Sequence, residues 1–187
     1  MPQFETAYRK LQPVLYSTFT GFCIMIILCG CPYHSAHKID TEPQLPIEES
    51  YLGNWIGSIK DETYGYTTNI KMLISKKNDM EYNLNFIGFF GRRDKKNKPI
   101  QDTIVGNSFL SIINSKLFMN IEADGRVYIA EFKYENDQIS LLPLAENFTN
   151  FIIQSDAELR YRIGYHYKTR LNPSYDESFC LRNMRRE

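Results

Sequence analysis

Cysteine is the residue type with the most chemistry in this 187-residue chain, and three of the four cysteines lie near its N-terminus. These three lie within or just after an apolar run at residues 19–28, whereas Cys180 is far from them. No Lys, Arg, Asp or Glu occurs in residues 11–36, and Arg9-Lys10 stands directly before that stretch. A basic start, a short apolar run and small residues after it are typical of a secretory signal. The run is short for a membrane span, which needs about 20 apolar residues.

The last residues of this region, Leu28-Cys29-Gly30-Cys31, resemble the lipobox of bacterial lipoproteins. The resemblance implies cleavage between Gly30 and Cys31 and a covalent lipid on the Cys31 thiol, with no other cofactor. Acyl chains anchor durably because each buried CH₂ contributes about 0.8 kcal/mol. In that family Asp after the lipidated Cys favours the inner membrane. Pro32 here implies the outer membrane, with the protein facing the periplasm. The alternative is an uncleaved transmembrane helix over residues 14–31.

Three parts of the chain follow from this interpretation. Residues 1–30 are the expected signal peptide, and residues 31–50 are the lipidated Cys and a flexible tether. The tether holds three prolines without apolar periodicity, a composition that cannot offset its ordering entropy; its expected reach is about 25 Å. His34 and His37 lie in the tether without further metal ligands, so we expect them to be solvated. Residues 51–187 form one domain, long enough for a single core.

Within the domain, apolar and polar residues alternate with the period of a strand. We expect a hairpin over residues 70–86, strands over 117–123 and 126–135 around an Asp124-Gly125 turn, a strand over 138–142, a short helix over 145–154, a long strand over 161–168, a last short strand over 178–182, and a frayed tail. Such an antiparallel meander closes into a barrel or splits into a sandwich, because open edges invite aggregation. The sequence therefore predicts an all-β fold with one short late helix.

Gly53-Asn54-Trp55, on the first predicted strand, resembles the G-x-W signature of lipocalins and includes the only Trp of the chain. The resemblance implies a lipocalin-like barrel with Trp55 at its closed end and an apolar ligand inside. Other motifs of that family, including the Arg that covers the Trp, have no match in the sequence. Tyr161, Tyr165 and Tyr167 are the residues we expect in a core or a cavity. In the alternative, Trp55 is a core anchor of a different β-fold.

The densest charge in the chain is the predicted loop at residues 91–98, GRRDKKNK. Its basic residues are Arg92, Arg93, Lys95, Lys96 and Lys98, against a single Asp94. Basic clusters of this kind contact anionic headgroups or acidic partners. The alternative is a solvated hairpin loop.

Neither an enzyme nor a nucleic-acid-binding protein is indicated. His166 is the only His of the domain, and no nucleophile elbow, phosphate loop or metal motif accompanies it. The 22 basic and 22 acidic residues balance, so there is no global attraction to nucleic acid. Two functions remain: a membrane-anchored barrel that binds or carries a small apolar ligand or lipid, and a non-enzymatic structural or interaction subunit of a cell-envelope assembly. Cavity volume distinguishes them.

Overall fold

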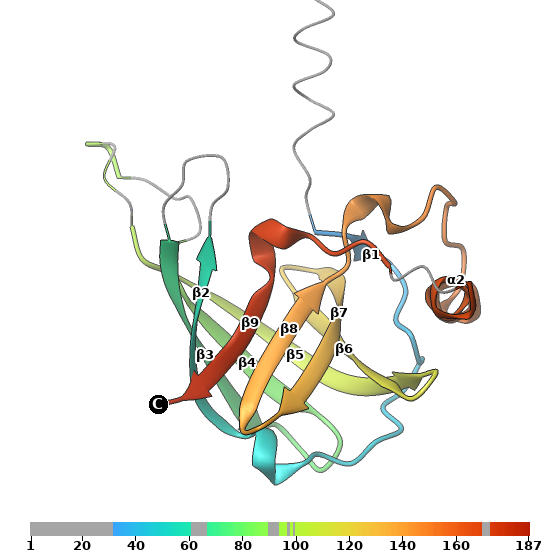
Figure 1. Cartoon of the computed structure of the whole chain (residues 1–187), viewed down its shortest axis with the longest axis horizontal. Coiled ribbons are helices and arrows are strands. Elements are labelled where there is room, and N and C mark those ends of the chain that lie inside the picture. The colour runs from blue at the N-terminus through green and yellow to red at the C-terminus, as the bar shows by residue number, and fades with distance from the viewer. Residues whose placement is uncertain (1–31, 61–66, 90–93, 97, 99, 170–172) are drawn as a thin grey trace, which may run out of the picture. The chain divides into compact units, whose positions relative to one another are not determined.

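The computed structural model describes residues 32–187 apart from 61–66, 90–93, 97, 99 and 170–172, and it is dominated by antiparallel strands (Figure 1). The strands are β1 (His34–Ser35), β2 (Gly53–Lys60), β3 (Thr67–Lys76), β4 (Tyr82–Gly88), β5 (Asp102–Ile113), β6 (Lys116–Ala123), β7 (Arg126–Glu135), β8 (Gln138–Pro143) and β9 (Leu181–Arg186). The helical elements are the 3₁₀ turns η1 (Glu49–Tyr51), η2 (Glu146–Phe148) and η3 (Glu177–Phe179) and the α-helix α2 (Asp156–Lys168).

Strands β2 to β9 form a closed eight-stranded antiparallel barrel. Each strand pairs with the next one in the sequence, and β9 pairs back onto β2 through Trp55↔Arg186 and Ile56↔Arg185. β1 lies outside this circuit and pairs with the start of β7, where His34 faces Tyr128. The predicted all-β meander is confirmed, and of the two predicted outcomes the chain adopts the barrel. Closure removes the exposed strand edges of an open sheet.

The two ends of the barrel differ in what closes them. At one end, Pro32 forms an isolated antiparallel β-bridge with Ala145, which follows β8. At the same end β4 terminates at Gly88, and the Asp124-Gly125 turn joins β6 to β7. We call this the entry end, because the described chain enters the barrel unit there. The opposite end, which we call the Trp55 end, contains the start of β2.

Tight turns connect several of the strands, and their residues have left-handed backbone angles. Asp124 and Gly125 have φ of 50° and 72°, and Asn136 and Asp137 have φ of 52° and 57°. Two-residue hairpin turns need positive φ at both positions, which Asn, Asp and Gly tolerate best. The predicted turns at 124–125 and 136–137 are therefore present for the expected reason.

Buried apolar residues form two clusters on either side of the barrel wall. The barrel interior contains Trp55, Ile70, Met72, Ile74, Tyr82, Leu84, Leu110, Met119, Ile121, Ala130, Phe132, Ile139, Leu141, Leu181 and Met184. A second cluster, which includes residues of α2, contains Ile39, Ile113, Phe118, Val127, Ile129, Leu144, Phe148, Leu159 and Ile163. Both clusters lie within the compact unit Pro32–Glu187, so we expect this unit to fold without residues 1–31.

The predicted long strand over residues 161–168 is wrong, because this stretch belongs to helix α2 (Figure 1). Leu159 and Ile163 are buried, four residues apart, whereas Tyr161 and Tyr165 are exposed. The Ser155 side chain caps the helix by accepting a hydrogen bond from the Glu158 N–H. Serine is one of the residues preferred at the N-cap position. The alternating tyrosines suggested the two-residue period of a strand. The buried residues Leu159 and Ile163 instead follow the four-residue spacing of one helix face. The helix predicted over 145–154 is reduced to the single turn η2.

The C-terminal residues close the barrel as β9 and are not the frayed tail predicted from the sequence. Leu181 and Met184 are buried but three residues apart, and Asn183 between them has φ of 51°. The pairing with β8 shifts register there, between Ile139 and Leu141. A bulge adds one residue to a strand and hides its period of two, which explains why the alternation was not visible. The strand predicted over 178–182 overlaps η3 and only the start of β9.

Residues 32–50, predicted to be a flexible tether, pack along the barrel in the structure. The Tyr33 N–H donates to the Leu144 carbonyl at 2.8 Å at the entry end, and the Ile47 N–H donates to the Asp79 carbonyl at 2.9 Å at the Trp55 end. Between them Ile39 is only 1% exposed and its N–H donates to Asn120 Oδ1 at 2.7 Å. Single apolar residues hold this segment in place, so it has no periodic pattern for sequence analysis to detect.

Candidate functional site

The Trp55 end of the barrel is plugged by aromatic and basic side chains. Trp55 is fully buried, and its Nε1–H donates to the Tyr51 carbonyl at 2.9 Å. The Arg186 guanidinium lies over the indole, 4.8 Å from the ring centroid, and its Nη2 donates to the Ser50 carbonyl at 2.6 Å. The sequence showed no Arg to cover Trp55, because Arg186 comes from the last strand and meets Trp55 only through barrel closure. These contacts obstruct this end of the barrel.

The barrel interior is filled by side chains where glycines could have left space. A Cβ on Gly57 would lie 2.8 Å from Met184 Cγ, and a Cβ on Gly88 would lie 2.2 Å from Ile70 Cδ1. Met184 and Ile70 therefore occupy the volume that these glycines leave empty. Three pockets stand out in the described part of the chain, and none is lined by a residue of the interior cluster.

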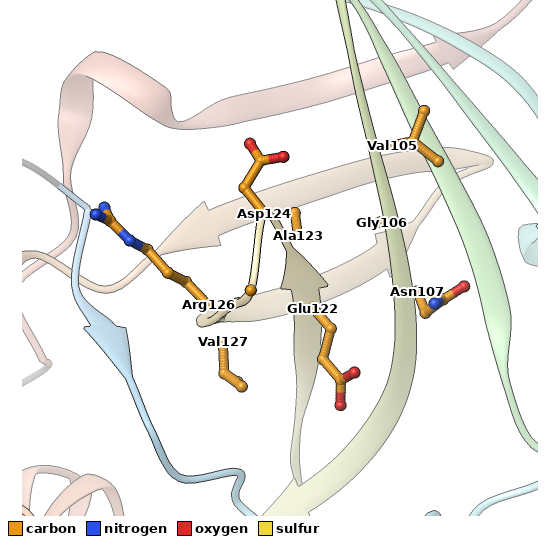
Figure 2. Close-up of a pocket in the computed structure, with 9 residues that line it drawn as sticks. Val105, Gly106, Asn107, Glu122, Ala123, Asp124, Arg126 and Val127 are labelled. Carbon is orange, nitrogen blue, oxygen red and sulfur yellow. The ribbon is translucent and has the colours of Figure 1, made fainter.

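One of these pockets is an open groove of about 390 Å³ at the entry end (Figure 2). It lies between Val105 on β5 and the turn that joins β6 to β7, where Asp124 and Arg126 project. The β5–β6 pairing begins only at Asn107↔Glu122, so β5 separates from β6 beyond this pair. Polar and apolar groups alternate around the groove, and it does not have the apolar lining of a lipid-carrying cavity.

The three tyrosines predicted for a core or cavity are split between two environments. Tyr161 and Tyr165 are 59% and 51% exposed on the outer side of α2. Tyr167 is half-buried, and its hydroxyl donates to Glu131 Oε2 at 2.9 Å. Because these residues lie on a helix and not on a barrel strand, none of them is part of the interior cluster.

Glu131 on β7 is the most buried carboxylate among the described residues, at 1% exposure, and sequence reasoning missed it. Lys116 Nζ lies 3.1 Å and Lys133 Nζ 3.4 Å from Oε1, while the Tyr167 and Tyr175 hydroxyls donate to Oε2. Its neighbours Ala130 and Phe132 are also buried. The burial of three consecutive residues of β7 shows that this strand is covered on both faces. The residues that cover its outer face, Tyr167 and Tyr175, lie far away in the sequence and could not be identified from it.

The surroundings of Glu131 hold it as an anion. Burial opposes ionisation, but hydrogen bonds from Tyr175, Tyr167 and Lys116 and the charge of Lys133 outweigh it, and the pKa of Glu131 lies below its usual value. Burial and the nearby carboxylate raise the pKa of both tyrosines well above the usual range. Both oxygens of this carboxylate are engaged, so it is poorly placed to accept a proton from a substrate. Through Tyr167 and Tyr175, the cluster cross-links α2 and the C-terminal segment to β7 of the barrel.

The described part of the basic loop projects from the entry end. Lys95, Lys96 and Lys98 are exposed, and the N–H groups of Lys96 and Lys98 each donate to Asp94 Oδ1 at 2.8 Å. These bonds hold the loop in a tight turn around the single carboxylate. Arg92 and Arg93 lie outside the described residues, as does Cys31.

The histidines are dispersed. His37 Nδ1 lies 3.1 Å from Asp156 Oδ1, and His166 on α2 lies against Phe148. No three His, Cys, Asp or Glu side chains converge as metal ligands in the described ranges. Cys180 is buried, and burial raises its pKa to about 12.

Comparisons with known proteins complete this description. Among the residues that the structure covers, no helix combines the length and apolar character of a membrane span. Neither a scan against known protein families nor searches of characterised proteins and of solved structures give a match.

Proposed function

We propose that this chain is a bacterial lipoprotein whose β-barrel is a packed scaffold. In this proposal a lipid on Cys31 anchors the protein to the periplasmic side of the outer membrane, and the barrel acts through its outer surface. It is a non-enzymatic structural or interaction subunit of a cell-envelope assembly, the second of the two functions that the sequence left open.

The filled barrel interior is the observation that supports this choice over a ligand carrier. Carriers bury most of an apolar ligand in a preformed cavity of about 300 to 1,000 Å³. Here Met184 covers Gly57 and Ile70 covers Gly88, while Trp55, Tyr51 and Arg186 obstruct one end. A ligand would have to displace these side chains from a close-packed core, which costs free energy.

Native mass spectrometry of the full chain, purified from membranes in mild detergent, tests the scaffold proposal. We expect the mass of the polypeptide with its covalent lipid and no additional non-covalent ligand. The Met184→Ala variant is the positive control, because removing this side chain opens space beside Gly57 for an apolar probe. Stoichiometric lipid released from the wild-type protein would contradict the scaffold and favour the carrier.

Peptide mapping tests the anchor separately. We expect an N-terminal peptide that begins at lipid-modified Cys31, and loss of fractionation with salt-washed membranes in Cys31→Ser but not in the control Cys180→Ser. An unmodified Cys31 with residues 1–30 still attached, or a Cys31→Ser variant that stays in the membrane after the salt wash, would support the transmembrane alternative.

A further inference from the structure

We propose that the entry end of the barrel rests on the bilayer, with Lys95, Lys96 and Lys98 against anionic phospholipid headgroups. The inference deepens the proposed function and depends on its lipid anchor at Cys31 for placing the barrel near the membrane. The partner is a phospholipid surface and not an acidic protein.

The first argument is that no flexible linker separates the proposed anchor position from the barrel, because the residues from Pro32 onward are packed against it. Pro32 bridges Ala145, the Tyr33 N–H is bonded to the Leu144 carbonyl at 2.8 Å, and Ser35 is 8% exposed. Pro32, the residue that directly follows the proposed anchor position in the sequence, is therefore already attached to the barrel by these contacts. A free tether would have allowed about 25 Å. A lipid at Cys31 would therefore hold the entry end close to the membrane surface.

The second argument is that the basic loop projects from that same end. It connects β4 to β5, and Gly88 pairs with Asp102 at its base. The Asp94 carboxylate accepts two backbone N–H groups, so a single engaged carboxylate opposes the three ammonium groups on this turn. On the neighbouring turn Asp124 and Arg126 offset each other in charge.

The third argument is the exposed apolar side chains on the stems of this loop and on the adjoining part of β5. Phe89 and Ile100, which flank the loop in the sequence, are 49% and 40% exposed, and Val105 on β5 is 63% exposed. Lysines next to exposed apolar side chains match an interface where charged headgroups lie above acyl chains. An acidic protein partner would use the charges but gives no special reason for this arrangement.

Vesicle binding of the separate unit, residues 32–187, tests the proposal without the anchor. We expect binding to vesicles that contain phosphatidylglycerol, little binding to pure phosphatidylcholine vesicles, and weakening by salt. Each lysine near such a surface contributes about fivefold in partitioning. Lys95→Glu plus Lys96→Glu should therefore reduce binding by at least about 25-fold, because two lysines are lost and two carboxylates are added.

The matched control makes the same charge change at the Trp55 end, as Lys76→Glu plus Lys77→Glu. Those two lysines are also adjacent and partly exposed, and each pairs with a nearby carboxylate. We expect the control to bind nearly as well as the wild type. Equal loss in both variants, or equal binding to neutral and anionic vesicles, would overturn the proposal.

Lysine footprinting of the attached protein tests the orientation. Residues 31–187 are coupled through the Cys31 thiol to a maleimide lipid in anionic vesicles, and amines are then acetylated and mapped by mass spectrometry. Cys180 is buried with a raised pKa, so it does not compete for the coupling. Protection of Lys95, Lys96 and Lys98 with Lys76 and Lys77 still reactive is expected, and the reverse or uniform pattern would refute the orientation. Because coupling replaces the natural lipid, the result stands whether or not peptide mapping supports the anchor.

Discussion

Replacing Ile39 by Ala tests whether residues 32–50 belong to the folded unit. Ile39 is 1% exposed in the cluster that also contains Phe118, Leu159 and Ile163. Truncating a buried Ile to Ala removes three carbons and leaves a cavity, which costs about 2 to 5 kcal/mol. The bond from the Ile39 N–H to Asn120 Oδ1 does not involve the side chain, so we expect about 3 kcal/mol less free energy of unfolding.

Urea denaturation followed by Trp55 fluorescence measures this change, since Trp55 is the only Trp and is fully buried. Ile152→Ala is the matched control, because Ile152 is 85% exposed and its truncation should change stability by less than about 0.5 kcal/mol. Hydrogen exchange of the Ile39 amide should show protection in the wild type and faster exchange in Ile39→Ala. Equal stability of the two variants, with an unprotected Ile39 amide, would refute the packed segment and remove the premise of the proposed membrane orientation.

Three further outcomes follow from the structure. The Glu131→Gln variant should be less stable than the wild type at neutral pH. The difference in stability should shrink as the pH falls below the ordinary carboxyl pKa of 4.5, because the lowered pKa of Glu131 adds stability only while this group is ionised. Urea denaturation at several pH values measures this difference, and a difference that stays constant with pH would contradict the assignment. The Cys180 thiol, with its pKa raised to about 12, should react with a disulfide reagent at pH 8 only after denaturation, and rapid reaction of the native protein would contradict its burial. Arg186→Met should cost about 1 kcal/mol through the lost cation–π contact with Trp55 and change the emission of Trp55, whereas an unchanged spectrum would show that the two groups are not in contact.

An antiparallel meander, closed as a barrel or split into a sandwich, could be predicted from the sequence because most of its strands follow local rules. The alternating runs around residues 70–86 and the Asp124-Gly125 and Asn136-Asp137 turns need only neighbouring residues to be recognised. These signals do not depend on distant parts of the chain. The strands predicted from these signals correspond to β3, β4, β6, β7 and β8, whereas β5 (Asp102–Ile113) was not predicted.

The errors arose where distant segments determine the local structure. The sequence of α2 has the alternation of a strand. It forms a helix because Leu159 and Ile163 pack in the second cluster, outside the barrel interior. β9 has a bulge at Asn183, and it forms because without it β2 and β8 would each have one unpaired edge. Glu131 is buried only because Tyr167 and Tyr175, more than 30 residues away, cover it. Tertiary contacts override local pattern in each case.

Residues 32–50 connect the two ends of the barrel, so under the proposed anchoring they would couple its stability to its attachment at the membrane. The segment begins beside Ala145 at the entry end, and at the Trp55 end its Ser50 carbonyl accepts from the Arg186 that covers Trp55. A pull on Cys31 would act first on the bonds of Tyr33 to Leu144 and of Ile39 to Asn120. If these contacts opened, the barrel would gain a tether and lose its fixed orientation toward the membrane. Under the proposed anchoring at Cys31, the strength with which this segment packs would therefore set how far the barrel surface can move from the membrane.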